Sequence, residues 1–72
     1  MDQVKPGLYR HYKGKDYQVI GVAGHTETEE QLVVYRALYG ERGLWVRPLA
    51  MFTEQVDIGG RQQPRFAYLG ER

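Results

Sequence analysis

The chain has 72 residues, no cysteine and a formal net charge of +1, from ten Lys and Arg against nine Asp and Glu. This length suits one domain with a small core, and the absence of cysteine excludes disulfides and cysteine-rich zinc sites. The balanced charge differs from the strongly basic footprint that most nucleic-acid-binding domains carry.

No stretch of the sequence approaches the roughly 18–20 apolar residues that cross a bilayer. Residues 1–15 lack the apolar run of a signal peptide. We therefore expect a cytoplasmic protein without a membrane partner. Residues 1–6 are expected to be extended or disordered, residues 7–70 to form a single small domain, and residues 71–72 to form a tail.

The first predicted element is a β-hairpin. Residues 7–12 are rich in Tyr, residues 16–25 are β-branched and aromatic, and a turn centred on Gly14 separates the two runs. Because side chains alternate along a strand, Tyr9 and His11 should point to the same face.

Two further strands are predicted at residues 31–39 and 44–48. The first is the most apolar stretch of the chain, and its apolar residues also fit helical spacing. The adjacent Val33 and Val34 and the short length favour a strand. Pro48 should end the second strand, because it has no N–H to donate to a ladder.

A single helical turn is predicted near residues 48–52, where Pro precedes four apolar residues. Met51 and Phe52 on this turn would plug the open end of a barrel, or would form a homodimer contact. The expected oligomeric state is therefore a monomer or a weak homodimer.

The predicted fold is all-β, with five or six short strands in a small SH3-like or otherwise curved barrel. Residues 55–69 should form its last hairpin, because Gly59 and Gly60 supply the positive φ of a tight turn. The strands at 16–25 and 31–39 carry apolar residues at both odd and even positions, so both of their faces are apolar. A sheet that folds over itself would cover both faces. Gly21 and Gly24 are the expected bend or bulge points.

The chain carries a set of short motifs rich in Tyr, Arg and Pro, namely Tyr9-Arg10-His11-Tyr12, Gly14, Tyr17, His25, Val34-Tyr35-Arg36, Leu38-Tyr39-Gly40, Trp45-Val46-Arg47-Pro48 and Pro64-Arg65-Phe66. With these motifs the sequence resembles, from about Gly7 to Gly70, a small bacterial family known only as domain-of-unknown-function family 1653. Gly24 departs from it, since a longer polar or charged residue is expected there. The resemblance implies a small β-rich fold and no activity for any residue.

The Tyr-rich first strand is one candidate binding surface. Its rings could stack on bases while Arg10, Lys13 and Lys15 hold phosphate groups, which would suit single-stranded nucleic acid or a nucleotide. In the alternative interpretation the rings line the barrel, because a Tyr ring packs well while its hydroxyl stays in water.

Trp45 and Arg47 are a second candidate surface, because they share one face of the strand at 44–48. Arg36, on the neighbouring strand, could lie across from them and form a groove for a carboxylate, a phosphate or a peptide. In the alternative interpretation Trp45 packs inside the barrel and Arg47 bridges to Glu54 or Asp57.

Catalysis has little support in the sequence, which contains neither Cys nor Ser as a nucleophile. His11, His25 and Glu27 are chemically suited to a metal. Simple pairing around Gly14 would place His11 near Tyr17 and leave His25 beyond the hairpin, so a metal site needs a fold-back that the sequence does not show. A hydrogen bond that caps the following loop is the expected role of His25. No cofactor is predicted.

The sequence therefore predicts a non-catalytic ligand-binding or interaction module rather than an enzyme, with a protein, a peptide or a nucleic acid as its partner. The candidate ligand-binding residues are Tyr9, His11, Tyr12, Tyr35, Arg36, Trp45 and Arg47. The first alternative is single-stranded nucleic-acid or nucleotide binding through Arg10, Lys13 and Lys15. The second is a small metal-dependent enzyme that uses His11, His25 and Glu27.

Overall fold

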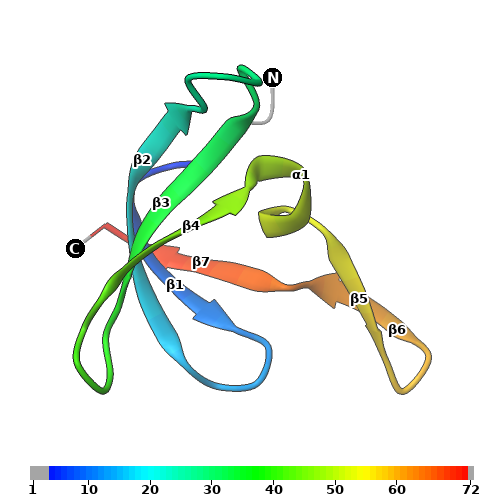
Figure 1. Cartoon of the computed structure of the whole chain (residues 1–72). Helices are drawn as coiled ribbons and strands as arrows, with labels where there is room; N and C mark the ends of the chain where they lie inside the picture. Colours follow the sequence, from blue (N-terminus) through cyan, green and yellow to red (C-terminus); the bar gives the residue numbers. More distant parts are fainter. Residues whose placement is uncertain (1–3, 72) are drawn as a thin grey trace.

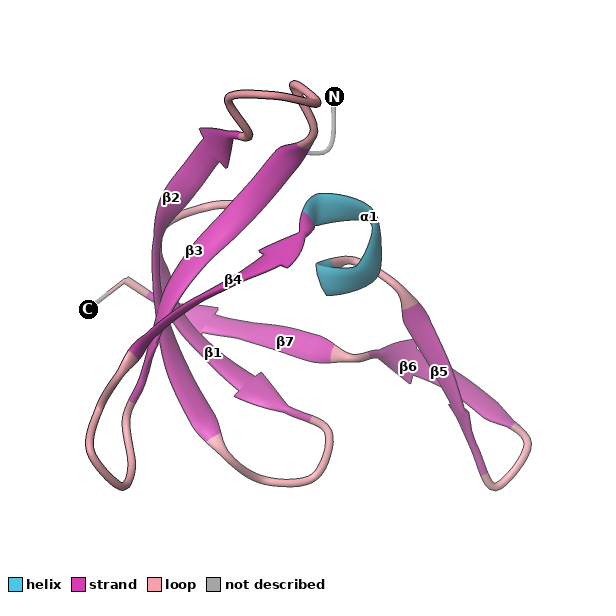
Figure 2. Cartoon of the chain, in the orientation of Figure 1, coloured by secondary structure: helices cyan, strands magenta, loops and turns pink. Residues whose placement is uncertain are grey.

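The structure is a computed structural model that describes residues 4–71, so residues 1–3 and 72 of the expected terminal segments lie outside the described residues. Seven strands and one short helix follow one another in the chain (Figures 1 and 2). Their bounds are β1 (Gly7–His11), β2 (Asp16–Gly24), β3 (Gln31–Ala37), β4 (Leu44–Pro48), α1 (Leu49–Phe52), β5 (Gln55–Ile58), β6 (Arg61–Pro64) and β7 (Phe66–Gly70). Among the described residues, no helix has the length and apolarity needed to cross a membrane.

The mostly β character and the single helical turn are confirmed. Five strands form one antiparallel sheet in the order β4-β3-β2-β1-β7, and β5 and β6 form a separate two-stranded sheet (Figure 1). The edge strands β4 and β7 do not pair with each other, so the sheet is not a closed barrel. The predicted curved barrel is therefore not closed in the described part of the chain.

Residues 4–71 form seven strands rather than the five or six predicted, because the last extended run is divided at Arg65. The Arg65 N–H donates to the Glu54 carbonyl oxygen at 3.0 Å, and its carbonyl oxygen accepts from the Tyr12 N–H at 2.9 Å. This residue thus connects the small hairpin on one side to β1 on the other. Gly59 and Gly60 have the positive φ values, 59° and 83°, that the predicted tight turn requires.

A bulge in β2 explains the apolar residues at both parities. The register with β3 shifts between Val19 and Gly21, which leaves Ile20 as the extra residue. As a result Val19 and Val22, three residues apart, face the same side of the sheet. Gly21 is confirmed as a bulge position, whereas Gly24 is the last residue of β2.

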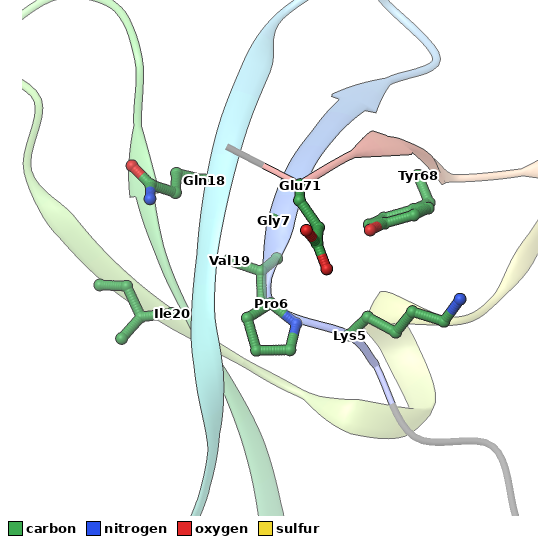
Figure 3. A pocket seen from close by; sticks show the side chains of 8 residues that line it. All are labelled: Lys5, Pro6, Gly7, Gln18, Val19, Ile20, Tyr68 and Glu71. Carbon is green, nitrogen blue, oxygen red and sulfur yellow. The ribbon is translucent and has the colours of Figure 1, made fainter.

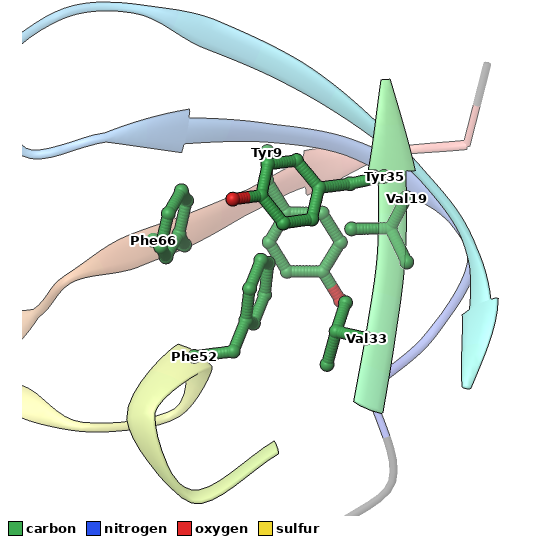
Figure 4. Close-up of a cluster of buried hydrophobic side chains, with 6 residues drawn as sticks. All are labelled: Tyr9, Val19, Val33, Tyr35, Phe52 and Phe66. Atoms are coloured by element: carbon green, nitrogen blue, oxygen red, sulfur yellow. The ribbon is translucent and has the colours of Figure 1, made fainter. Parts of the chain in front are cut away.

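The core is a compact group of rings and β-branched side chains on the inner face of the sheet (Figure 4). The buried residues of this cluster are Tyr9, Val19, Val33, Tyr35, Phe52 and Phe66. The Phe52 and Phe66 rings stack with centroids 4.2 Å apart, and Tyr9 meets Phe52 edge-on at 5.4 Å. Aromatic burial therefore supplies much of the small core.

Helix α1 carries Phe52 from the end of β4 into this core. Pro48, at φ −53°, precedes the helix and has no N–H to leave unpaired. One turn later the Thr53 hydroxyl donates to the Leu49 carbonyl oxygen at 3.0 Å. The helix ends there, and Phe52 is buried while its neighbour Met51 is exposed.

Candidate ligand-binding site

The β1–β2 and β3–β4 turns lie at the same end of the five-stranded sheet (Figure 1). Four partly exposed rings in or next to these turns pack against one another. We call these four residues, His11, Tyr12, Tyr17 and Tyr39, the aromatic rim. Ring centroids are 4.6 Å apart for His11 and Tyr12, 6.5 Å for His11 and Tyr17, and 5.5 Å for Tyr17 and Tyr39. The Tyr17 and Tyr39 hydroxyl oxygens share a hydrogen bond of 2.7 Å.

The rim rests on the core. His11 meets Phe66 edge-on at 4.9 Å, and Tyr17 meets Tyr35 edge-on at 5.3 Å. Because Phe66 and Tyr35 are buried, they hold the inner edges of the rim rings in place and leave the outer edges free. A ring surface fixed in this way costs little conformational entropy when a ligand binds.

The β1–β2 turn sets the position of His11. The His11 N–H donates to the Lys15 carbonyl oxygen at 2.7 Å, and the Gly14 N–H donates to the His11 carbonyl oxygen at 2.7 Å. The residue opposite Tyr17 is Tyr9, so the expected pairing of His11 with Tyr17 is wrong by two positions. The His11 Nδ1 atom accepts from the Lys13 N–H at 3.1 Å, which fixes the imidazole over the turn.

Three cations lie over ring faces beside the rim. Lys13 Nζ is 5.8 Å from the centroid of Tyr12, Lys15 Nζ is 4.7 Å from that of Tyr39, and Arg47 Cζ is 5.4 Å from that of Phe66. Within residues 4–71, none of the three cations takes part in an ion pair. Their positive charge is therefore not neutralised by a nearby carboxylate.

The pKa values at the rim reflect these surroundings. Partial burial lowers the pKa of His11 below its ordinary value, and the positive charges of Arg47, Arg65 and Lys13 lower it further. Burial also raises the pKa of Tyr17, and the hydrogen bond with Tyr39 adds to the rise. Near neutral pH the rim thus consists of uncharged rings in a positive field.

Two of the predicted ligand-binding residues belong to the core instead of the surface. Tyr9 and Tyr35 are only 7% and 6% exposed. The Tyr9 hydroxyl donates to the Lys5 carbonyl oxygen at 2.9 Å, so its polar end is already satisfied. The alternative interpretation, in which the Tyr rings line the interior, describes these two residues.

The predicted grouping of Arg36 with Trp45 and Arg47 is wrong. Arg36 lies opposite Leu44, while Trp45 lies opposite Tyr35, so Arg36 and Trp45 are on different faces of the sheet. The Arg36 Nη1 atom donates to the Arg42 carbonyl oxygen at 2.8 Å and holds the β3–β4 turn. Its role in the structure is local.

Trp45 is 60% exposed, so its predicted burial is also wrong. β4 is an edge strand, and the core rings are supplied by β1, β3, β7 and α1 instead. Arg47 lies over Phe66, and the ion pair with Glu54 is made by Arg65, at 2.8 Å. The expected bridge from Arg47 to Glu54 or Asp57 is not formed.

The three residues of the nucleic-acid alternative are divided between two settings. Arg10 makes an ion pair with Asp16 at 2.7 Å. Lys13 and Lys15 instead lie over rim rings. Sequence reasoning missed Tyr17 and Tyr39 as members of this surface, although their positions beside the two turns could have identified them.

The three residues of the metal alternative do not form a ligand set. Residues 4–71 contain no group of three or more His, Asp or Glu side chains that could hold a metal ion. His11 ends β1, whereas His25 follows β2 and its Nδ1 atom accepts from the Glu27 and Thr28 N–H groups at 3.1 and 3.3 Å. The loop-capping role predicted for His25 is confirmed.

A separate hollow of about 550 Å³ lies where β1 begins and β7 ends (Figure 3). Its lining residues are Lys5, Pro6, Gly7, Gln18, Val19, Ile20, Tyr68 and Glu71. Lys5 Nζ is 5.2 Å from the Tyr68 ring centroid. The hollow combines one cation, one carboxylate and one exposed ring, and it shares no residue with the aromatic rim.

Comparison with known proteins shows the family of the chain. The family described as "Protein of unknown function (DUF1653)" matches residues 7–68. The chain belongs to the DUF1653 family. A DUF1653 protein from Bordetella bronchiseptica, known from its crystal structure, is 46% identical to this chain, with a TM-score of 0.87 over 96% of this chain and 91% of that one. No curated protein matches. The family resemblance seen in the sequence is confirmed, and it brings a fold without an activity.

Proposed function

We propose that this DUF1653 protein is a non-catalytic binding module whose ligand contacts the aromatic rim and the cations beside it. One observation carries the proposal: Lys13, Lys15 and Arg47 lie over ring faces and pair with no carboxylate of residues 4–71. Such cations are available to an anionic ligand, while the exposed rings of Tyr12 and Tyr39 offer an apolar surface beside Lys13 and Lys15.

The pKa of His11, which is lowered first by burial and then by nearby cations, is consistent with an anionic ligand at this surface. Arg47, Arg65 and Lys13 each disfavour a proton on the imidazole, so the potential at this point of the surface is positive. A bound anion would oppose that potential. Binding should therefore raise the pKa of His11 towards its ordinary value, and binding should strengthen as the pH is lowered through that range.

Single-stranded nucleic acid is the ligand class that these features favour. It offers flat bases for Tyr12 and Tyr39 and phosphates for Lys13 and Lys15, and modules of this kind combine the same two elements. A protein or an acidic peptide remains the alternative ligand. It would use the same cations with less stacking.

The architecture that we propose for the module is an SH3-like, incompletely closed barrel formed by residues 7–70 as a single domain. The strand order β4-β3-β2-β1-β7, with one helical turn after β4, supports this assignment. It would make the rim one end of the curved sheet, beside two of the hairpin turns.

The test is a titration of the ¹⁵N-labelled protein, followed by its amide spectrum. The probes are a mixed-sequence single-stranded oligonucleotide, an acidic peptide of matched charge, and zinc. The matched variants are Lys15→Ala in the rim and Arg61→Ala, an exposed cation in β6. Shifts at the rim that Lys15→Ala weakens and Arg61→Ala leaves unchanged would support the proposal.

The remaining outcomes separate the alternatives. Rim shifts with the peptide alone would replace nucleic acid by a protein ligand. Zinc shifts confined to His11, His25 and Glu27 would favour the metal-dependent enzyme. The binding proposal is rejected if neither anionic probe moves the rim resonances.

A further inference from the structure

Edge strand β4 carries three consecutive exposed apolar side chains. Leu44, Trp45 and Val46 are 55%, 60% and 57% exposed, and β4 pairs with β3 alone in the described sheet. Folded proteins usually protect such an edge with Lys, Pro or a bulge, because its free backbone groups can pair with another strand. From Gly43 to Val46 this edge has none of these protections.

The backbone groups that face away from β3 can be identified. The Ala37 N–H donates to the Gly43 carbonyl oxygen at 3.1 Å. In an antiparallel pair, residues alternate between those that bond to the neighbouring strand and those that do not. Like Gly43, Trp45 and Arg47 therefore form their backbone hydrogen bonds with β3. Leu44 and Val46 instead direct their N–H and C=O groups at the free edge.

We propose that this edge pairs with β4 of a second copy of the chain, antiparallel and across a twofold axis at Trp45. Rotation about a twofold axis perpendicular to a sheet leaves every side chain on the same face of that sheet. Residues that stand opposite each other in the two strands must therefore point to the same face. With Trp45 opposite its own copy, Leu44 of one protomer faces Val46 of its partner. Each of these two pairs exchanges two backbone hydrogen bonds, so all the outward groups of Leu44 and Val46 are satisfied.

Pro48 limits the alternatives. An axis one residue later, at Val46, would place Leu44 opposite Pro48, which has no N–H and already begins the turn into α1. The axis at Trp45 avoids this and uses residues 43–47. Arg47 then faces Gly43, so no like charges meet in the paired run.

The opposite edge of the sheet is a poorer partner. The register of β7 with β1 shifts between Leu8 and Tyr9, and Gly70 has a φ of 138°. Both irregularities interrupt a continuous ladder, whereas the β3–β4 register has no shift. Pairing of β4 with β4 also closes on itself and leaves no free strand of the same kind.

This inference does not depend on the proposed ligand. It gives the exposure of Trp45 a structural reason, since the two Trp45 side chains would lie beside each other on the inner face. The aromatic rim of each protomer stays outside the paired run, because none of its four residues belongs to β4. Association is measured without ligand, so its failure and that of the proposed function are distinguishable.

The test of the register uses the absence of cysteine in the chain. Trp45→Cys places two thiols at a non-hydrogen-bonded pair, where Cα atoms are about 4.5 Å apart and a disulfide can form. Val46→Cys is the matched control, because its partner position is Leu44. Rapid oxidation of Trp45→Cys to a covalent dimer, with little from Val46→Cys, is expected. The reverse result, or equal rates, would overturn the proposed axis.

The test of the association is sedimentation velocity over a wide range of protein concentration. The unmodified chain should shift from monomer to dimer as its concentration rises. Val46→Lys should abolish the shift, because it puts a charge opposite Leu44 of the partner. Ile20→Lys changes a similarly exposed apolar residue on β2 and should leave the shift intact. A chain that stays monomeric throughout, or equal loss in both variants, would overturn the proposal.

Discussion

The rings of Phe52 and Phe66 stack with centroids 4.2 Å apart and only 4° between their planes. Phe52 ends the helical turn after β4, and Phe66 begins β7, so this contact joins the two edges of the sheet through their side chains. It takes the place of the backbone pairing that would have closed a barrel.

Phe52→Ala should strongly destabilise the fold. The side chain is almost fully buried, and its loss removes contacts with Tyr9, Tyr35 and Phe66 and leaves a cavity. The free energy of unfolding should fall by about 3–5 kcal/mol, measured by urea denaturation. Met51→Ala, on the exposed side of the same turn, is the control and should change it by less than about 1 kcal/mol. Equal effects would mean that α1 does not anchor the core.

Gly7→Ala should destabilise the fold, because the added Cβ atom would clash with a neighbouring strand and because the backbone at Gly7 has a positive φ. Gly7 has a φ of 146°, and a Cβ atom there would lie 2.6 Å from the Gly70 carbonyl oxygen. The clash is with backbone, so it can be relieved only by separating β1 from β7. A loss of at least about 1 kcal/mol is expected in thermal or urea unfolding.

Gly24→Ala is the matched control for that change. Nothing lies within 4 Å of a Cβ atom at Gly24, and its φ is not in the left-handed region. Its stability should match or slightly exceed that of the unmodified chain. If the two Gly variants behave alike, the close approach of Gly7 to Gly70 is not a constraint on the fold.

The stability of the fold should depend on pH through His11. Its pKa is lowered in the folded state by burial and by nearby cations, so the unfolded chain binds the proton more readily. The contribution is therefore complete above the ordinary pKa near 6.5 and is lost as the pH falls below it. His11→Gln should flatten the dependence of the unfolding free energy on pH in this range.

His25→Gln is the control for the pH experiment, because both imidazoles accept backbone N–H groups of their own turns. The His25 variant should retain the pH dependence of the unmodified chain. A flat profile in the unmodified chain would contradict the lowered pKa of His11 in the folded state. Loss of the dependence in the His25 variant alone would move its origin to the other turn.

Oligonucleotide binding, where observed, should distinguish the three cations of the first hairpin. Lys13→Ala or Lys15→Ala should each reduce the slope of log affinity against log salt by about 0.7, as expected for one lost phosphate contact to a single strand. Arg10→Ala should change the slope little, because Arg10 is engaged by Asp16. Fluorescence anisotropy at several salt concentrations measures the slopes. An equal loss in all three variants would contradict a site restricted to the rim.

The Tyr17 hydroxyl should lose its proton only above the ordinary pH range of a tyrosine. Burial is the larger cause of the raised pKa of Tyr17, and its hydrogen bond with Tyr39 is the second. Tyr39→Phe should therefore lower the pKa of Tyr17 only in part. The ring carbon resonances of labelled Tyr, followed through alkaline pH, provide the measurement. A full return to the ordinary value would show that the hydrogen bond, rather than burial, controls this group.

Much of the fold could be predicted from local patterns. The turn residues Gly14, Gly59 and Gly60 and the stop at Pro48 delimit the hairpins and the helical turn, because each imposes its own backbone geometry. The end of β4 at Pro48 follows directly from the last of these signals. What these signals do not encode is which strands meet at the sheet edges.

The wrong predictions for the candidate site arise because local signals do not specify which strands form the edges of the sheet. One interpretation placed Arg36 beside Trp45 in a groove, and the alternative buried Trp45 in the barrel. Neither describes the structure, since strand parity alone does not say which strand is at the edge or which residues stand opposite each other. The observed register places Leu44 opposite Arg36 and leaves Trp45 at the edge. The bulge at Ile20 likewise reverses which side chains in the second half of β2 point to each face of the sheet. Such features depend on contacts between distant residues, which a single sequence specifies only through the complete fold.

The pairing of β1 with β7 has a consequence for the order of events during protein synthesis. β1 leaves the ribosome well before β7, its second neighbour in the sheet, because the core residue Phe66 at the start of β7 is made more than fifty residues after β1. Until then the β1–β2–β3–β4 portion has exposed rings and no Phe66 to cover them. The domain should therefore acquire its stable fold only after β7 has been made, and nascent chains stalled before β7 should remain sensitive to protease.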